Sequence, residues 1–494
     1  MSTESAITPR AADYSQWYLD VISSADLADY SPVKGCMVFK PHGFALWEAM
    51  RDDLDRRFKE TGHVNAYFPL LIPMSFLSKE AQHVEGFAKE CAVVTHHRLR
   101  ALPGGAGVEP DPASKLEEPL VIRPTSETII WHMYGQWIQS WRDLPILINQ
   151  WANVVRWEMK TRPFLRTTEF LWQEGHTAHA TKDEALEETR RMLGVYAAFA
   201  REILAMPVIE GAKTTSERFA GADDTLCIEA LMQNGWALQA GTSHFLGQNF
   251  AKAFDVTFTG PSGEREHVWA TSWGVSTRLV GAVIMTHSDD AGLVLPPAIA
   301  PIQVVVTPIW KGDAERADML AFAEKVRSML APRFRVRVDT RDNLKPGAKY
   351  FEWERKGVPL RLEIGPRDVK NNAVFAAPRF GGGGKFAIPL DTLVDTVADK
   401  LAWMQSELYA RALASRDARI HRPDTWSAFL EQLENGGFLL VPWHDDAAAE
   451  EKVKEETRAT IRCYPFEGQD EAAGRTCVYS GRPATHMALF ARAY

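Results

Sequence analysis

Charged and aromatic side chains that could bind a nucleotide gather between Asn149 and His176, in the stretch NQWANVVRWEMKTRPFLRTTEFLWQEGH. A guanidinium group suits phosphate and carboxylate oxygens, and the flat ring of a phenylalanine suits the face of a purine. A glutamate can accept a hydrogen bond from an exocyclic amine. The side chains of these types are Arg156, Glu158, Arg166 and Phe170. Together they predict a nucleotide site.

A β-hairpin would position these side chains. The runs 149–157 and 165–173 have the composition of strands, and residues 160–163 have that of a turn. Residues an even number apart lie on one face of a strand, so Arg156 and Glu158 share a face, as do Arg166 and Phe170. The alternative is an ordinary hairpin whose charged side chains are only solvated.

The same stretch resembles a known family. The pattern Arg156-x-Glu158, a loop, then Arg166-x-x-x-Phe170-x-x-x-Glu174 resembles motif 2 of the class II aminoacyl-tRNA synthetases. The pentapeptide WQEGH, which ends at His176, resembles the version found in the prolyl-tRNA synthetases. In that family the motif binds ATP and the amino acid.

Residues 41–61 precede this stretch and carry an apolar stripe at helical spacing, with Gly62 as a stop. A buried strand is predicted over 64–72, before Pro73. This unit resembles motif 1, which forms the dimer interface in the family; a plain core helix is the alternative. The sequence LVIRPTSE, residues 120–127, predicts a strand that runs into a helix, and its Thr-Ser-Glu turn could be only a helix cap. The resemblance implies that Thr125 and Glu127 contact the secondary amine of proline.

Two later segments complete the predicted site. The strand 238–247 contains GTSH, whose small residues let a ligand approach the backbone. Residues 268–287 are strand-like up to Trp273 and helical beyond Gly274, and the N-terminus of a helix favours anions. This last segment resembles motif 3, with Arg278 as the arginine of the γ-phosphate.

The resemblance implies a role for each site residue. Arg156 would bridge the substrate carboxylate and the α-phosphate, and Arg166 and Arg278 would hold the outer phosphates. The implied ATP-binding set is Arg156, Glu158, Arg166, Phe170, Gln239, Thr242 and Arg278. The implied proline-binding set is Thr125, Glu127, Arg156, Trp172, Glu174, His176, Phe219 and His244.

The length of 494 residues exceeds what one core usually supports, so several domains are expected. A proline-rich connector at 293–301 marks the clearest boundary. Beyond it, residues 301–380 contain sixteen basic and ten acidic side chains, a balance of +6 in a chain of net charge −8. This segment alternates strands and helices and resembles the family's anticodon-binding domain. Its charge suits RNA, although a solvated surface is the alternative.

The C-terminal region resembles the last domain of the archaeal-type prolyl enzymes, in which four cysteines often bind zinc. Here Cys477 is followed at the CxxC position by Ser480, and no cysteine stands near His444. A tetrahedral zinc site needs four ligands, so no zinc is expected. The five scattered cysteines predict a reducing cytoplasm, and no run of residues is apolar enough to span a bilayer.

These observations predict an α+β catalytic domain with an antiparallel sheet (1–295), an α/β anticodon-binding domain (301–405) and a small α+β C-terminal domain (406–494). The expected activity is that of an archaeal-type prolyl-tRNA synthetase without the bacterial editing insertion. It would use L-proline, ATP, Mg²⁺ and tRNA(Pro), and act as a homodimer. A threonyl enzyme is the nearest alternative; a catalytically silent paralogue that only binds tRNA or an amino acid is the other, but all three motif arginines are present.

Overall fold

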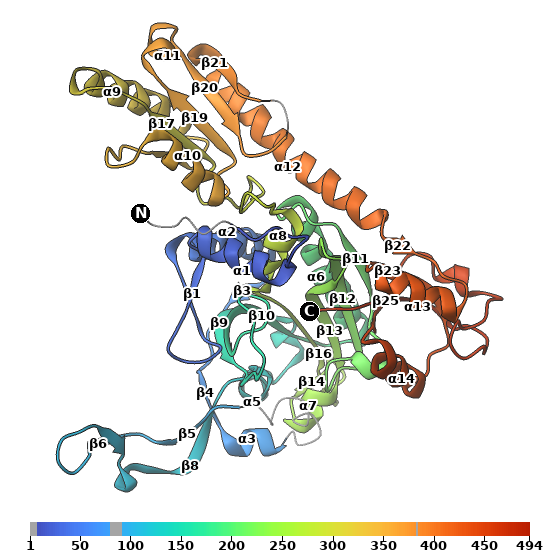
Figure 1. The fold of residues 1–494 in the computed structure, drawn as a ribbon. Helices are drawn as coiled ribbons and strands as arrows, with labels where there is room; N and C mark the ends of the chain where they lie inside the picture. Colours follow the sequence, from blue (N-terminus) through green and yellow to red (C-terminus); the bar gives the residue numbers. More distant parts are fainter. Residues whose placement is uncertain (1–6, 80–90, 382–383) are drawn as a thin grey trace.

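The computed structural model of the chain describes residues 7–79, 91–381 and 384–494 (Figure 1). The largest sheet in these ranges has eleven strands, in the order β22-β23-β25-β24-β11-β12-β13-β16-β10-β9-β3. Neighbouring strands are antiparallel except for the pairs β3–β9 and β22–β23. The central strands are β11 (Val208–Ala212), β12 (Asp224–Leu231), β13 (Ala237–Gly247), β16 (Trp269–Ser276), β10 (Glu169–His179), β9 (Ile146–Val155) and β3 (Val64–Asn65).

Helices pack against one face of this sheet and form its main core. The helix α6 (Lys182–Glu202) lies along β13 and β16, and Thr181 begins it with a capping box to Glu184. The predicted apolar stripe of α2 (Pro41–Glu60) is buried at Leu46, Trp47, Met50, Leu54 and Phe58, whereas Phe44 is partly exposed. The other helices of this part are α1 (Tyr14–Ser24), α3 (Met74–Lys79), α5 (Glu127–Trp137), α7 (Asn249–Ala253) and α8 (Arg278–His287).

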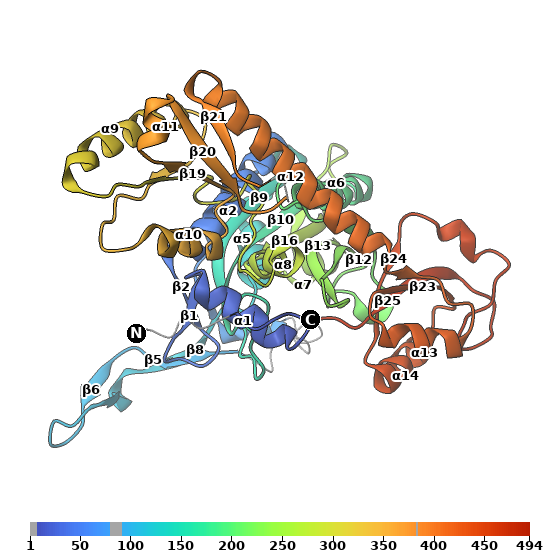
Figure 2. The same ribbon diagram turned by 45° about the horizontal axis from the view of Figure 1, so that its top comes forward.

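Short strands outside the main sheet form an arm that extends from the body (Figures 1 and 2). Its strands are β4 (Leu71–Pro73), β5 (Val93–His96), β6 (Leu99–Ala101), β7 (Val108–Pro110) and β8 (Lys115–Ile122), with a 3-10 turn at Pro112–Ser114. The expectation of a strand over 64–72 is wrong: only its ends are strands, and Val64 is exposed. Because β6 and β7 bury little apolar surface, they lack the alternating pattern by which strands are predicted.

Smaller elements join these parts. They are β1 (Ala28–Tyr30), β2 (Met37–Phe39), β14 (Thr257–Thr259), β15 (Arg265–His267), and the 3-10 turns Trp141–Asp143 and Thr215–Glu217. The strand β16 continues to Ser276, three residues past its expected end at Trp273, because its last residues still pair with β10.

A second unit, of the α/β type, follows the proline-rich connector, as expected. Its five strands lie in the order β18-β17-β19-β20-β21, and the first three are parallel. The elements are β17 (Val304–Pro308), α9 (Asp313–Leu330), β18 (Val336–Val338), α10 (Pro346–Arg355), β19 (Leu360–Ile364), α11 (Pro366–Lys370), β20 (Ala373–Pro378), β21 (Phe386–Pro389) and a 3-10 turn at Leu390–Thr392.

The long helix α12 (Leu393–Asp417) connects this unit to the C-terminal unit (Figure 1). The boundary predicted between residues 405 and 406 falls inside this helix. The C-terminal unit contains β22 (Ile420–His421), α13 (Trp426–Glu434), β23 (Phe438–Trp443), α14 (Ala447–Thr457), β24 (Thr460–Pro465), a 3-10 turn at Gln469–Ala472 and β25 (His486–Ala491).

The C-terminal unit is not a separate layer. Its strand β24 pairs with β11 through Gly211 and Ala212, so its strands extend the sheet that carries the pocket. The predicted fold class, an α+β first domain with an α/β unit and a small C-terminal unit, is confirmed. No helix in the described ranges combines the length and apolar character that a membrane crossing requires.

Candidate functional site

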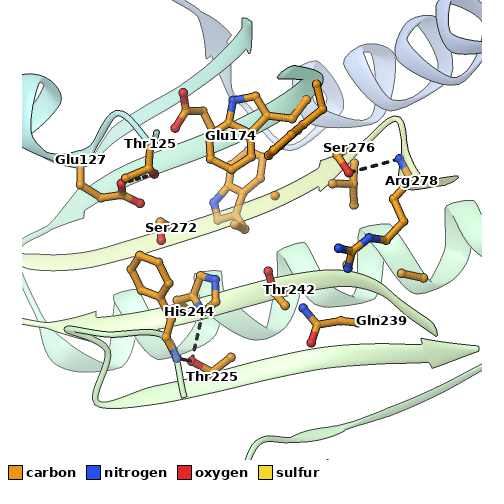
Figure 3. A pocket seen from close by; sticks show the side chains of 18 of the residues that line it. Thr125, Glu127, Glu174, Thr225, Gln239, Thr242, His244, Ser272, Ser276 and Arg278 are labelled. Carbon is orange, nitrogen blue, oxygen red and sulfur yellow. Dashed lines mark hydrogen bonds between the residues drawn. The ribbon is translucent and has the colours of Figure 1, made fainter. Parts of the chain in front are cut away.

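A pocket of about 260 Å³ opens on the face of the central sheet opposite α6 (Figure 3). Its floor is formed by β10, β13 and β16, whose side chains alternate between this face and the helix-covered core. Twelve of the fourteen predicted site residues line it. They are Thr125, Glu127, Arg156, Phe170, Trp172, Glu174, His176, Phe219, Gln239, Thr242, His244 and Arg278.

One end of the pocket is acidic. Glu127 and Thr125 lie there, from the start of α5, and the Thr125 hydroxyl donates to the Glu127 carboxylate (Figure 3). Glu174, on β10, has both carboxylate oxygens occupied: one accepts from Ser126 and from Gln150 Nε2 at 2.7 Å, and the other lies 2.9 Å from His176 Nε2. The Glu127 carboxylate is therefore the one that can turn to a cationic ligand.

The pKa values of two histidines near this end are shifted in opposite directions. Burial lowers the pKa of His176, but the hydrogen bond to Glu174 and the nearby carboxylates outweigh it and leave that pKa raised. Burial, and then the charge of His176, lower the pKa of His244 to about 3. His244 Nδ1 lies 3.0 Å from the Thr225 hydroxyl, and its ring packs against Phe219 with centroids 4.7 Å apart. His244 is thus a neutral, flat wall of the pocket.

The other end is basic. Arg278 begins α8, and its Nε donates to the Leu165 carbonyl at 3.1 Å, which leaves the rest of the guanidinium directed into the pocket near Gln239 (Figure 3). Burial, and then the charge of Arg156, lower the pKa of Arg278 to about 10, so it remains charged at neutral pH. A buried cation at a helix N-terminus is suited to an anionic ligand.

Arg156 is held by aromatic rings. Its guanidinium carbon lies 5.4 Å from the ring centre of Phe170 and 5.5 Å from that of Trp172, and its Nε donates to the Pro124 carbonyl at 3.0 Å. Such contacts fix the plane of the guanidinium. Burial lowers the pKa of Arg156 while Glu127 and Glu174 oppose that shift. The group therefore links the two ends of the pocket.

Two predicted residues do not line the pocket. Arg166 Nε lies 2.7 Å from Glu158 Oε2, and the Arg166 side chain is 60% exposed. The prediction that Arg156 and Glu158 share a strand face is wrong, because β9 ends at Val155 and β10 begins only at Glu169. Residues 156–168 form the connecting loop, which carries Phe164 and Leu165 into the core.

The sequence did not single out several lining residues, namely Lys213, Glu217, Thr225, Ser272 and Ser276. Ser272 and Ser276 each stand two residues from Gly274 on β16, so strand alternation could have identified them. No local signal points to Lys213, because its position follows from the pairing of β11 with β12.

Among the described residues no group of three or more His, Cys, Asp or Glu side chains is placed to hold a metal ion. The Ser480 backbone N–H donates to Cys477 Sγ at 3.5 Å, and His444 Nδ1 donates to the Pro483 carbonyl at 2.7 Å.

Three family models match successive parts of the chain. Residues 109–287 match the tRNA synthetase class II core domain (G, H, P, S and T), residues 303–400 match an anticodon binding domain, and residues 426–494 match the C-terminal part of prolyl-tRNA synthetase.

Similar proteins were found in several bacteria. The chain is 59% identical over 489 residues to a proline–tRNA ligase of Porphyromonas gingivalis, and 57% identical over 492 residues to one of Bacteroides fragilis. A proline–tRNA ligase of Cytophaga hutchinsonii is 56% identical over 488 residues. Each alignment covers at least 98% of this chain and 99% of the relative.

Proposed function

Because the chain belongs to the prolyl-tRNA synthetases of class II, we propose that its pocket joins L-proline to the α-phosphate of ATP and then passes the prolyl group to tRNA(Pro). The chain is an enzyme of the proline–tRNA ligase class. The proposed mechanism is supported by the opposite charges at the two ends of the pocket: a carboxylate stands at one end and Arg278 at the other.

The acidic end suits proline. The charged secondary amine would pair with the Glu127 carboxylate, which the Thr125 hydroxyl holds in place by a hydrogen bond. Glu174 is less suited to this role, because Ser126, Gln150 and His176 already occupy its carboxylate oxygens. Trp172, Phe219 and His244 would enclose the small apolar ring. Because His244 is neutral, it adds no repulsion against the amine.

The basic end suits the triphosphate. Arg156 would contact both the proline carboxylate and the α-phosphate, and Arg278 the outer phosphates, with Gln239 and Thr242 beside the nucleotide. The proline carboxylate oxygen attacks the α-phosphorus, an acyl–phosphate bond forms, and pyrophosphate leaves with the electron pair of the broken P–O bond. The carboxylate is already ionised, so positioning and charge neutralisation suffice.

The adenine and loop contacts remain proposals. Phe170 would stack on adenine, while Glu158 and Arg166 would reach the nucleotide only by giving up their mutual ion pair. Of the carboxylates that line the pocket, Glu127 and Glu174 lie away from Arg278 (Figure 3). A magnesium ion would therefore be held chiefly by the phosphates of ATP, as is usual for this ion. The expectation that no zinc is bound stays a prediction.

Proline-dependent exchange of labelled pyrophosphate into ATP tests the activity. The purified chain should catalyse exchange with proline, and much more weakly with other amino acids. Preference for threonine would favour a threonyl enzyme. Silence with all twenty amino acids, from protein that still binds tRNA, would leave only the binding-module alternative.

We further propose the architecture without an editing insertion. The 95 residues from Glu174 to Val268 form strands of the central sheet, the helices α6 and α7 and the small sheet β14–β15, which supports this proposal. Each methylene that alanine lacks costs only about 10- to 200-fold in discrimination, so a proline pocket cannot strongly exclude alanine. The pure enzyme should form alanyl-adenylate and leave preformed alanyl-tRNA(Pro) intact; rapid enzyme-dependent deacylation would contradict the proposal. The relatives described above are bacterial, and the archaeal-type affiliation rests on this architecture and on the resemblance of the C-terminal region.

We propose a homodimer that joins through the region after α2. Val64 and Tyr67 are 61% and 70% exposed there, and Leu71 is also exposed. Apolar side chains gathered in this way often mark an interface. Sedimentation equilibrium should give twice the mass of the chain, and Tyr67→Asp should shift the equilibrium toward the monomer.

The enzyme would act in the cytoplasm, where its five free cysteines would stay reduced.

The domain boundaries are likewise proposals. A catalytic unit would end near residue 295 and an anticodon-binding unit would begin at 301. Since α12 continues to Asp417, a fragment of residues 301–418 is the better choice for testing RNA binding by the second unit. That fragment should bind tRNA, with an affinity that falls as salt rises, because its excess basic charge would contact phosphates.

A further inference from the structure

A cluster of three charged side chains lies beside the basic end of the pocket. Glu229 stands on β12 directly opposite Gln239 of β13, so both are on the pocket face of the sheet. Lys213 Nζ lies 3.0 Å from Glu229 Oε1, and Arg462 of β24 donates from Nε and Nη2 to the same carboxylate, each at 3.1 Å. The cluster therefore joins three strands, one of which belongs to the C-terminal unit.

The cluster is buried and not neutral. Glu229, Lys213 and Arg462 are 0%, 4% and 8% exposed, and the two cations are hydrogen-bonded to one carboxylate. Glu217, which lines the pocket, is a further carboxylate whose charge acts on Arg462, without a hydrogen bond to it among the described residues. The pKa of Glu229 is lowered because the two cations outweigh its burial, so the three groups are ionised at neutral pH. A buried excess positive charge is unfavourable unless an anion approaches it. The nearest opening is the pocket, which Lys213 lines.

Lys213 has one donor left for a ligand. An ammonium group has three N–H donors. Two of them go to Glu229 and to the Arg462 carbonyl oxygen, the latter at 2.6 Å. The third has no acceptor among the described residues. The ammonium contacts Glu229, which stands opposite Gln239, and Gln239 lies beside Arg278 in Figure 3. We therefore place the ammonium toward the Arg278 end of the pocket.

Arg462 sets the position of this ammonium in two ways. Its guanidinium fixes the Glu229 carboxylate with two hydrogen bonds, and its own carbonyl accepts from Lys213. The Arg462 guanidinium also donates to the Thr460 hydroxyl at 2.9 Å, which ties the group to β24. The Lys213 ammonium thus depends on the C-terminal unit for both of its protein acceptors.

We propose that Lys213 binds the triphosphate of ATP through its third N–H, and that Arg462 of the C-terminal unit is the positioning residue that holds it there. The proposal rests on the proposed function and deepens it. It gives the C-terminal unit a direct part in nucleotide binding. Glu229 and Arg462 do not line the pocket, and Glu229 stands opposite Gln239 rather than opposite a residue of the acidic end, so we expect proline binding not to depend on the cluster.

Steady-state pyrophosphate exchange tests the proposal. Lys213→Met and Arg462→Met should each raise the KM for ATP at least about 10-fold, and the KM for pyrophosphate in the same direction, as loss of a charge-assisted contact predicts. The KM for proline should stay within about 2-fold. Arg462→Lys, which keeps the charge, should restore most of the ATP affinity.

Arg419→Met is the matched control. Arg419 also bridges to the catalytic part, through Nη1 and the Gln233 carbonyl at 2.8 Å, but it does not line the pocket. It should lower the melting temperature without changing the ratio of the two KM values. If Arg462→Met does not fold, Lys213→Met alone decides the outcome.

The possible outcomes are distinct. An unchanged KM for ATP in Lys213→Met, or an equal rise in both KM values, would overturn the inference while the parent enzyme remains active. A parent enzyme without proline-dependent exchange would instead refute the proposed function itself.

Discussion

At the scale of single residues, the two carboxylates of the acidic end have different tasks. Glu174 is saturated by Ser126, Gln150 and His176, whereas Glu127 accepts a hydrogen bond from only the Thr125 hydroxyl among the residues that the structure describes. A buried carboxylate with its acceptors filled fixes its surroundings, and one with spare acceptors can take a ligand. The sequence motifs contain a glutamate at both positions, and they do not show which of the two binds a ligand.

Arg156 should be the most sensitive residue of the pocket. Arg156→Ala removes a charged contact to both proposed reactants and also the cation that packs between Phe170 and Trp172. We expect a loss of activation on the order of 100-fold or more. Single-turnover formation of prolyl-adenylate measures it. Arg56→Ala, on the exposed face of α2, is the control and should retain the parental rate.

Buried histidines make the stability depend on pH. Burial lowers the pKa of His287 to about 4, although the ring bonds the Leu204 carbonyl at 2.8 Å. The unfolded side chain titrates near 6.5, so the unfolded chain binds the extra proton between these values. The free energy of unfolding should therefore decrease as the pH is lowered through this window, by about 1.4 kcal/mol per pH unit for this group.

The comparison of two variants measures this dependence. Melting temperatures recorded between pH 7 and pH 5 should fall less steeply for His287→Gln than for the parent. His97→Gln, at an exposed position of the arm, should keep the parental slope. Parallel slopes in all three proteins would show that His287 does not titrate as described.

At the scale of elements, the close pairing of β10 and β16 depends on a glycine. Gly175 stands opposite Trp273, and a Cβ at residue 175 would lie 2.1 Å from atoms of the Trp273 ring. Trp273 is itself fixed by contacts with Phe58 and Tyr196 in the core under α6. The glycine of the WQEGH motif is therefore required by packing, and it keeps the neighbouring Glu174 and His176 in place.

Gly175→Ala should destabilise the protein by at least about 1–3 kcal/mol, as overpacking of a core does. It should also impair proline use, because β10 must shift. Gly194→Ala provides the matched control: it lies in α6 with no atom within 4 Å of the added carbon, so it should be neutral or stabilise by about 0.5–1 kcal/mol. Chemical denaturation of both variants checks the prediction; equal stabilities would contradict it.

At the scale of the whole molecule, the C-terminal unit completes the central sheet. Its strand β24 covers the edge of β11, and apolar residues of both parts share one cluster that includes Cys227, Leu231, Phe438 and Leu489. An uncovered edge strand with apolar neighbours promotes aggregation. We therefore expect the catalytic part to depend on residues 426–494 for its solubility.

A chain that ends at residue 425 should therefore associate and lose thermal stability. Light scattering and thermal unfolding measure the two effects. Replacing Gly211, whose added Cβ would lie 2.7 Å from Cys463 Sγ, with alanine should produce a milder form of the same defect in the full chain. A truncated protein that keeps the oligomeric state and the melting temperature of the parent would show that the catalytic sheet is independent.

Local patterns in the sequence determined much of the protein. The stripe of α2, the start of α5 at Glu127, the strand β13 and the start of α8 at Arg278 were all predicted within a few residues. Each depends on side chains close together in the chain, whose periodicity and caps are readable without the fold. The resemblance of short motifs, read in order, supplied the twelve residues that do line the pocket.

The tertiary structure alone decided the rest. Arg166 and Glu158 pair with each other because the loop after β9 carries Phe164 and Leu165 into the core, which no strand pattern reveals. Lys213 reaches the pocket because Glu229 and Arg462, the latter 249 residues away, fix its ammonium. Contacts between such distant residues depend on which strands become neighbours in the sheet. The order of the strands in space, with β24 beside β11, follows from packing of the whole molecule.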